Sequence, residues 1–274
     1  MNHTLPFAVN CSLLFTELPL LERPAAAKAA GFDAVEFWWP FDEAVPGDAE
    51  VTAFEAAVRD AGVSLVGLNF FAGDMPGGDR GLVSWPERLQ EFSDNVDVTV
   101  GIGDRLGCRA FNALYGNRIE GVEPAALDEL AAENLASAAD AAAAIGATVL
   151  VEPVSGAPHY PLLSAADAVA VIERVEGLSG ATNLGLLADL YHLAVNNDDV
   201  DKVIEAYVDR VAHVQLADAP GRNEPGSGLL PLNRWLTGLE DAGYQGWVAL
   251  EYKPSGSTLD SLAWLPTERR GSGR

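Results

Sequence analysis

The chain reads Thr148-Val-Leu-Val-Glu152, Leu184-Gly-Leu-Leu-Ala-Asp189, Val211-Ala-His-Val-Gln215 and Trp247-Val-Ala-Leu-Glu251 at four places in its second half. Each stretch is a short apolar run that ends in a side chain with an oxygen atom. The closing residues follow one another at intervals of roughly 30 residues, about the length of one strand–helix unit. Near-continuous apolar runs are typical of buried parallel strands. The four stretches therefore predict parallel strands whose polar ends meet at one mouth.

The same alternation of strand-like and helix-like stretches runs along nearly the whole chain. Strands are expected over 7–10, 34–37, 65–69, 109–112, 148–152, 184–188, 211–215 and 247–251. Helices are expected over 18–30, 49–61, 85–106, 124–145, 164–175, 199–208 and 231–242. The expected helix ends are Gly31, Gly62, Gly107, Gly146 and Gly243, and the expected N-caps are Ser164 and Asp199. Strands that alternate with helices predict parallel pairing through βαβ units.

Eight such units predict an α/β fold, a single-domain (β/α)8 TIM barrel, whose usual length is about 250 residues. A doubly wound open sheet is the alternative, and it often carries a glycine-rich phosphate-binding turn after its first strand. The corresponding turn here reads Asn10-Cys-Ser-Leu-Leu-Phe-Thr16 and contains no glycine. We therefore expect one barrel over residues 1–265 and a flexible C-terminal tail over 266–274.

The composition limits the possible partners and the cellular location. The chain carries 40 acidic and 17 basic residues, for a formal net charge of −23. Binding to nucleic acid depends on Lys and Arg at phosphates, so this charge disfavours nucleic acids and anionic membranes as partners. The start of the chain lacks the features of a signal peptide, and no apolar stretch reaches the roughly 20 residues that span a membrane. The two distant cysteines, Cys11 and Cys108, form no disulfide framework and favour a cytoplasmic location.

The residues that close the four apolar runs are candidate metal ligands. They are Glu152, Asp189, Gln215 and Glu251. A single carboxylate at a strand end is ordinarily a helix cap or an ion-pair partner, whereas four oxygen-bearing side chains at matching positions favour a shared site. Three carboxylates would repel one another without a cation between them. Because all the ligand atoms would be oxygens, Mg²⁺ or Mn²⁺ suits the set better than zinc.

Two further polar side chains follow expected strand ends and are candidates for substrate binding. His192 lies three residues after Asp189 and either faces the same cavity or is a buried histidine bonded to backbone. Lys253 lies two residues after Glu251 and either faces the mouth or is a solvated lysine.

The loop over residues 215–228 is rich in glycine and proline and follows the seventh expected strand, where barrels often bind anions. Arg222 in this loop could form a two-pronged bond with a carboxylate. The alternative is a surface arginine that pairs with Asp218 or Glu224.

The first half of the chain supplies two more candidates for substrate binding. Glu36 ends the second expected strand, next to Trp38 and Trp39, which form either a pocket wall or part of the core. Asn69 ends the third expected strand and opens a glycine-rich loop over residues 69–81 that could shape or cover the mouth.

Several strings in the chain resemble those of hydroxypyruvate isomerases. They are Val35-Glu-Phe37, Asn69-Phe-Phe-Ala-Gly-Asp74 with Arg80-Gly81, Val151-Glu-Pro153, Asp189-Leu-Tyr-His192, Gln215-Leu-Ala-Asp-Ala-Pro-Gly-Arg-Asn-Glu-Pro-Gly-Ser-Gly228 and Gly243-Tyr-Gln-Gly-Trp-Val-Ala-Leu-Glu-Tyr-Lys-Pro254. The resemblance runs from about residue 7 to residue 265, and its 211–254 stretch is highly specific. The wider group is the xylose-isomerase-like TIM barrels, which include ketose 3-epimerases and endonuclease IV-type nucleases.

The resemblance implies an isomerase that interconverts hydroxypyruvate and tartronate semialdehyde by proton transfer through a metal-stabilised enediolate. It implies that Glu152 and Glu251 are the catalytic acid/base pair. It also implies that these two glutamates, with Asp189 and Gln215, hold one divalent ion, Mg²⁺ or Mn²⁺.

The implied substrate is a small anionic hydroxy-oxo acid, so a cation must face its carboxylate in an otherwise acidic site. His192, Arg222 and Lys253 are the candidates, and Arg80 is more remote. Trp264, near the C-terminus, fits either a contact in a homo-oligomer or packing within the chain.

Departures from the family pattern leave the exact substrate open. Ala188 stands where the family commonly has Tyr, and Ser155 stands where Asn is usual. The nearest alternatives are a 2-oxo-tetronate isomerase and a ketose 3-epimerase, and a longer acid needs more room around Ser155 and Trp38. The net charge of −23 and the presence of only four histidines disfavour a nuclease. The presence of both glutamates disfavours a barrel that binds sugar acids without catalysis.

Overall fold

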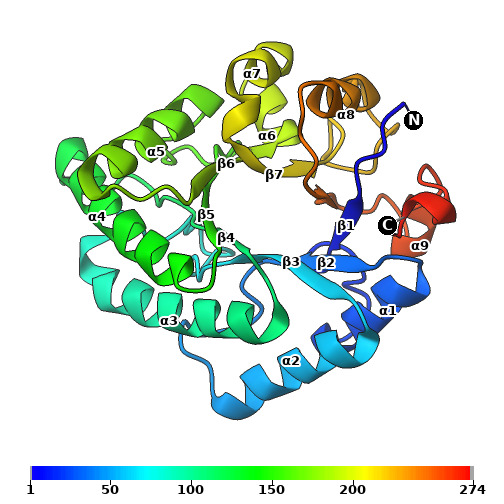
Figure 1. Ribbon diagram of the computed structural model, residues 1–274, viewed down its shortest axis with the longest axis horizontal. Coiled ribbons are helices and arrows are strands. Elements are labelled where there is room, and N and C mark those ends of the chain that lie inside the picture. Colours follow the sequence, from blue (N-terminus) through cyan, green and yellow to red (C-terminus); the bar gives the residue numbers. More distant parts are fainter. Residues whose placement is uncertain (1, 272–274) are drawn as a thin grey trace.

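Eight parallel strands form a closed barrel in the computed structural model, which describes residues 2–271 (Figure 1). The strands are β1 (Phe7–Asn10), β2 (Ala34–Phe37), β3 (Ser64–Asn69), β4 (Ala110–Asn112), β5 (Thr148–Val151), β6 (Leu184–Asp189), β7 (Val211–Leu216) and β8 (Val248–Leu250). Each strand pairs with the next along the chain, and β1 pairs with β8 to close the ring. The predicted (β/α)8 fold is confirmed, and the strand bounds differ from the predicted ones by at most a residue at each end.

The register of the barrel places the polar ends of neighbouring strands side by side. Asn10 pairs with Glu36 across β1 and β2, and Asp189 pairs with Gln215 across β6 and β7. The strands themselves are almost wholly buried, as both faces are covered by the barrel interior and by helices. The polar side chains can therefore reach solvent only at the carboxyl-terminal mouth.

Helices surround the barrel, as the ring of coils outside the strands in Figure 1 shows. They are α1 (Arg23–Ala29), α2 (Asp48–Ala61), α3 (Leu89–Leu106), α4 (Pro124–Ala143), α5 (Ala165–Ser179), α6 (Leu190–Val195), α7 (Val200–Tyr207), α8 (Leu232–Asp241) and α9 (Thr258–Ser261). Four short 3-10 helices accompany them, namely η1 (Leu20–Glu22), η2 (Pro86–Arg88), η3 (Val208–Arg210) and η4 (Thr267–Arg269). The sequence did not predict α6 or α9, because single-turn and two-turn helices carry little periodicity.

The predicted helix ends are confirmed. Gly31, Gly62, Gly107, Gly146 and Gly243 all have φ between 67° and 105°, the left-handed region that ends a helix. Ser164 Oγ accepts a hydrogen bond from Asp167 N, and the Asp199 side chain accepts one from Lys202 N, so both act as N-caps.

The large core lies between the barrel and the helices, while a small cluster of Ala8, Ala34 and Ala249 sits apart from it. Within residues 2–271, no helix is both long enough and apolar enough to cross a membrane. Part of the expected C-terminal tail packs on the rest of the chain. Arg270 donates hydrogen bonds to the carbonyls of Ala30, Leu262 and Leu265. Residues 272–274 of that tail lie outside the described residues.

Candidate active site

Every strand of the barrel carries a buried polar side chain at or next to its carboxyl end. In chain order these are Asn10, Glu36, Asn69, Asn112, Glu152, Asp189, Gln215 and Glu251. Buried polar groups must be paired with one another or with something that the site binds. The pattern of pairing around this ring therefore distinguishes structural positions from functional ones.

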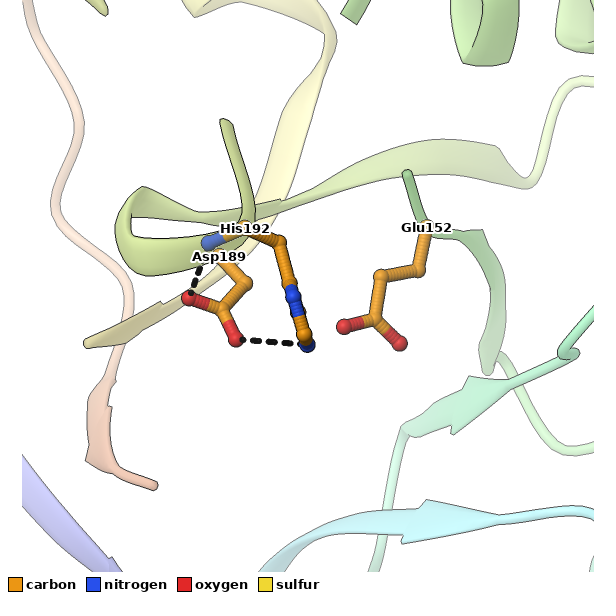
Figure 2. Close-up of side chains that lie close together, drawn as sticks. All are labelled: Glu152, Asp189 and His192. Carbon is orange, nitrogen blue, oxygen red and sulfur yellow. Dashed lines mark hydrogen bonds and ion pairs between the residues drawn. The ribbon is translucent and has the colours of Figure 1, made fainter. Parts of the chain in front are cut away.

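Glu152, Asp189 and His192 come together on one side of the ring. One ligand atom from each lies within 4.8 Å of the other two. Figure 2 shows the Glu152 carboxylate facing the His192 ring and the Asp189 carboxylate at the end of β6. Asp189 Oδ1 caps α6 by accepting hydrogen bonds from the backbone N–H groups of Tyr191 and His192 at 2.8 and 3.3 Å. This cap fixes the carboxylate and leaves its second oxygen available.

Three buried oxygens in the ring, Asn112 Oδ1, Asp189 Oδ2 and Gln215 Oε1, have no hydrogen-bond partner in the described part of the chain, and the last two belong to expected metal ligands. Gln215 presents its oxygen because its Nε2 donates to Glu36 Oε1 at 2.8 Å. Buried oxygens without a donor are costly unless a cation or an ordered water contacts them. Glu152 lies near Asp189, and Gln215 pairs with Asp189 in register, so oxygens of these three residues suit a hard divalent ion by their chemistry.

Glu36 is fully occupied by hydrogen bonds. Its Oε1 accepts from Asn10 Nδ2 and Gln215 Nε2, each at 2.8 Å, and its Oε2 lies 2.7 Å from His213 Nε2. Gly67 leaves the space that Glu36 needs, since a Cβ there would lie 3.0 Å from Glu36 Oε2. Glu36 does not line the cavity at the mouth. We therefore reassign it from substrate binding to holding Gln215 in position.

The two expected catalytic residues, Glu152 and Glu251, are both buried. Asn112 Nδ2 donates to Glu152 Oε2 at 2.6 Å, and Asn10 Nδ2 donates to Glu251 Oε2 at 3.2 Å. Burial raises the pKa of Glu152 to about 8, and the nearby Asp189 carboxylate adds to the rise. Burial also raises the pKa of Glu251 well above its ordinary value, against the opposing effect of Arg222. Each carboxyl group therefore holds a proton more readily than a solvent-exposed glutamate does.

His192 is neutral and oriented by Ser155. Burial lowers the pKa of His192 to about 4, and its Nδ1 accepts a hydrogen bond from Ser155 N at 3.0 Å. The proton of the neutral ring therefore lies on Nε2, which is 3.5 Å from Asp189 Oδ2. Burial therefore disfavours the cationic form of His192, which was one of the candidates to face the substrate carboxylate. A protonated Nε2 can donate to a substrate oxygen but cannot bind a metal.

Arg222 points into the barrel. Its Nη2 contacts Glu251 Oε1 at 2.5 Å and lies 3.6 Å from Asp189 Oδ2. Asp218, the alternative partner from the sequence, instead accepts backbone N–H groups of Ala219, Gly226, Gly228 and Leu230 and so organises the loop. Glu224 bonds Ser255. The surface interpretation of Arg222 is therefore wrong.

A cavity of about 360 Å³ opens at the mouth of the barrel. Its lining includes the expected residues Asn69, Glu152, His192, Arg222, Glu251 and Lys253, and also Trp38, Met75, Pro76, Arg80 and Ser155. Trp38, Asn69, Met75 and Pro76 also line a second hollow of about 940 Å³ beside it. The first cavity suits a molecule of a few carbons, and the second leaves room for extension along the Trp38 side.

Asn10, Asn112 and His213 were not singled out from the sequence. Asn10 and Asn112 each end a short apolar run, which is the same pattern that predicted Glu152, Asp189, Gln215 and Glu251. Applying that pattern to all eight strands would have found both asparagines. His213 lies inside its strand and gives no comparable signal in the sequence.

The barrel and its acidic mouth define a class of protein that the comparisons identify. Residues 24–268 match the family model described as xylose isomerase-like TIM barrel. A solved structure from Brucella melitensis, titled as an AP endonuclease of family 2, is 37% identical, with a TM-score of 0.85, covering 94% of this chain and 97% of that one.

Two curated relatives narrow the class. A Streptomyces coelicolor protein named "Putative hydroxypyruvate isomerase" is 54% identical over 97% of each chain. A Cupriavidus necator protein named 2-oxo-tetronate isomerase is 33% identical over 94% of this chain and 96% of the relative. The chain belongs to the hydroxypyruvate isomerase family within the xylose isomerase-like TIM barrels. It is accordingly an isomerase of the intramolecular oxidoreductase class.

Proposed function

We propose that this protein interconverts hydroxypyruvate and tartronate semialdehyde, with Glu152 and Glu251 as the acid/base pair. The observation that carries the proposal is the presence of two buried carboxyl groups, directly after β5 and β8, in the wall of one small cavity. Burial raises the pKa of each glutamate, which favours its holding a proton taken from carbon.

The reaction moves one proton between neighbouring carbons of a three-carbon acid. One glutamate takes a proton from the hydroxymethyl carbon, and the electron pair left behind delocalises onto the carbonyl oxygen to give an enediolate. The other glutamate protonates the former carbonyl carbon, and the proton of the original hydroxyl group passes to the former carbonyl oxygen, which gives the aldehyde and the new hydroxyl group. The two glutamates exchange roles in the reverse reaction.

The polar neighbours hold the two glutamates and the substrate in position. Asn112 fixes Glu152, while Asn10 and Arg222 fix Glu251. The Nε2–H group of His192 is placed to donate to a substrate oxygen and so favours the negative charge that develops there.

The oxygen ligands Glu152, Asp189, Gln215 and Glu251 would hold one divalent ion, Mg²⁺ or Mn²⁺. Such an ion acts as a Lewis acid that lowers the energy of a developing oxyanion by several kcal/mol. The unpartnered oxygens of two of these ligands, Asp189 Oδ2 and Gln215 Oε1, support this assignment.

A 2-oxo-tetronate isomerase is the second candidate, favoured by the hollow beside Trp38 that could receive a fourth carbon. A nuclease is disfavoured by the net charge of −23. A nuclease site with several metal ions would need more histidine ligands. His213 is hydrogen-bonded to Glu36, and His192 accepts a hydrogen bond from Ser155.

Side-by-side assays test the choice of substrate. Hydroxypyruvate, a 2-oxo-tetronate and a ketohexose are supplied to the Mn²⁺-loaded protein, and kcat/KM is compared. We expect the largest kcat/KM for hydroxypyruvate. A larger value for the 2-oxo-tetronate would select the second candidate, and a larger value for the ketohexose would point to a ketose 3-epimerase.

A further inference from the structure

The cations around the cavity are not equivalent. His192 Nδ1 accepts a hydrogen bond from Ser155 N and its Nε2 faces Asp189, while the Arg222 guanidinium contacts Glu251 and lies near Asp189. Arg222 therefore offsets the charge of the site itself. A substrate carboxylate entering this acidic cavity would still need a cation that is not already paired.

Arg80 is such a cation. It lines the cavity and is half-buried, and its Nη1 donates only to the carbonyls of Met75 and Asp79, at 3.0 and 2.6 Å. The carboxylate next to it, Asp79, pairs instead with Arg88 at 3.1 Å. Across residues 2–271, no ion pair involves Arg80. Its positive charge is therefore available to a ligand.

The backbone on both sides of Arg80 is fixed against the barrel. Arg80 O accepts a hydrogen bond from Gly116 N at 2.9 Å, and Gly81 N donates to Ala72 O at 3.0 Å. A Cβ at Gly81 would lie 1.8 Å from the Leu114 carbonyl oxygen, so this close approach requires glycine. A guanidinium on such a fixed segment loses little freedom when it binds an anion.

Lys253 is the second unpaired cation of the cavity wall. Its backbone N donates to Arg222 O at 2.7 Å, which ties it to the arginine loop. Its ammonium group has no ion-pair partner anywhere in the described chain, and the residue is exposed. An exposed ammonium contributes less than a partly buried guanidinium, because water screens it.

We propose that Arg80, assisted by Lys253, binds the substrate carboxylate and makes this barrel select 2-oxo acids over neutral ketoses. The inference rests on the proposed function and names the residues that set its substrate class. Arg222 and His192 then serve the reacting oxygens, while Arg80 and Lys253 serve the group that does not react.

The test uses the Mn²⁺-loaded full chain and two substrates of matched shape. Dihydroxyacetone carries a hydroxymethyl group where hydroxypyruvate carries its carboxylate. Arg80→Met is expected to raise KM for hydroxypyruvate about 10- to 100-fold, as for the loss of a hydrogen-bonded charge, with little change in kcat. Its kcat/KM for dihydroxyacetone should stay within about twofold of the parent, Arg80→Lys should fall between, and Lys253→Met should show a smaller rise.

Lys202→Met, which removes the same charge from an exposed position on α7, is the matched control and should change nothing. An unchanged KM for hydroxypyruvate in Arg80→Met, or an equal loss with both substrates, would overturn the proposal. Calorimetric binding of glycerate, which keeps the carboxylate but is not isomerised, gives a readout that does not need turnover. If the parent protein fails to isomerise hydroxypyruvate, the proposed function fails, whereas an unchanged glycerate affinity in Arg80→Met overturns the role of Arg80.

Discussion

Glu36 and Asp189 are two fully buried carboxylates of the same ring, but they have very different surroundings. Glu36 receives donors from two other strands, namely Asn10 on β1 and both His213 and Gln215 on β7. Asp189 uses one oxygen to cap α6 and leaves Oδ2 without a hydrogen bond in residues 2–271. A buried carboxylate whose two oxygens both have hydrogen-bond partners stabilises the fold. A buried carboxylate with an oxygen that lacks a partner marks a position where a ligand can bind.

The largest effect is expected at the two glutamates that carry the chemistry. Glu152→Gln and Glu251→Gln should each lower kcat about 10⁴-fold, because an amide cannot exchange a proton with carbon. Steady-state assays with hydroxypyruvate measure this, and circular dichroism should show an intact fold. Glu120→Gln, at an exposed position, is the control and should retain full activity. Substantial turnover in either glutamine variant would rule out the two-glutamate mechanism.

Glu36→Met tests whether a carboxylate with all its hydrogen bonds made stabilises the fold. This substitution keeps the length of the side chain but leaves the Asn10, Gln215 and His213 donors unpaired in the barrel. Loss of a buried charged partner should lower the free energy of unfolding of the metal-free protein by about 4 kcal/mol. Urea denaturation monitored by tryptophan fluorescence measures the change. A loss below about 1 kcal/mol would show that Glu36 is not a structural residue.

Asp189→Asn tests whether the carboxylate with an unpartnered oxygen is a metal ligand. The variant keeps an oxygen to cap α6, but it replaces a charged ligand atom and should weaken Mn²⁺ binding about 100-fold, or roughly 2.7 kcal/mol. The free energy of unfolding without metal should not fall, because the substitution also removes repulsion between Asp189 and Glu152. Mn²⁺ titration followed by electron paramagnetic resonance measures the affinity. Unchanged Mn²⁺ affinity together with a less stable fold would place Asp189 in the same structural role as Glu36.

His3 is a buried side chain outside the ring of strand ends, and its effect on stability is confined to low pH. Burial lowers its pKa from 6.5 to about 4, so the folded protein holds the ring neutral while the unfolded chain protonates it. Stability should therefore fall as pH drops from about 6.5 towards 4, by up to about 1.4 kcal/mol per pH unit from this residue. Urea denaturation at pH 7, 5.5 and 4.5 measures the slope. His3→Phe should have a shallower slope, and an unchanged slope would remove His3 as a cause.

The sequence predicted the barrel and the acidic site because both depend on local patterns. Each strand is an apolar run with a polar end, and barrel closure alone brings Glu152, Asp189, Gln215 and Glu251 to one mouth. The hydrogen bonds of Glu36 could not be predicted, because its partners Gln215 and His213 lie 179 and 177 residues away in the chain. No local pattern encodes that register.

The charge states of the basic residues were also beyond the sequence. His192 loses its charge through burial, and Arg222 is committed to Glu251, but both facts depend on packing around the mouth. The sequence therefore ranked Arg80 as remote, whereas the loop over 73–81 brings it to the cavity wall. Burial and ion pairing, rather than position in a sequence motif, determine which basic side chain is available to bind a substrate carboxylate.

The most direct measurement is a progress curve with hydroxypyruvate, in which tartronate semialdehyde is reduced by a coupled NADH-dependent reductase. The protein is treated with EDTA and assayed before and after addition of Mg²⁺ or Mn²⁺. We predict that NADH oxidation disappears with EDTA, returns with the divalent ion and remains absent in Glu152→Gln. Failure to form tartronate semialdehyde with either ion, or full activity after EDTA treatment, would contradict a metal-dependent hydroxypyruvate isomerase.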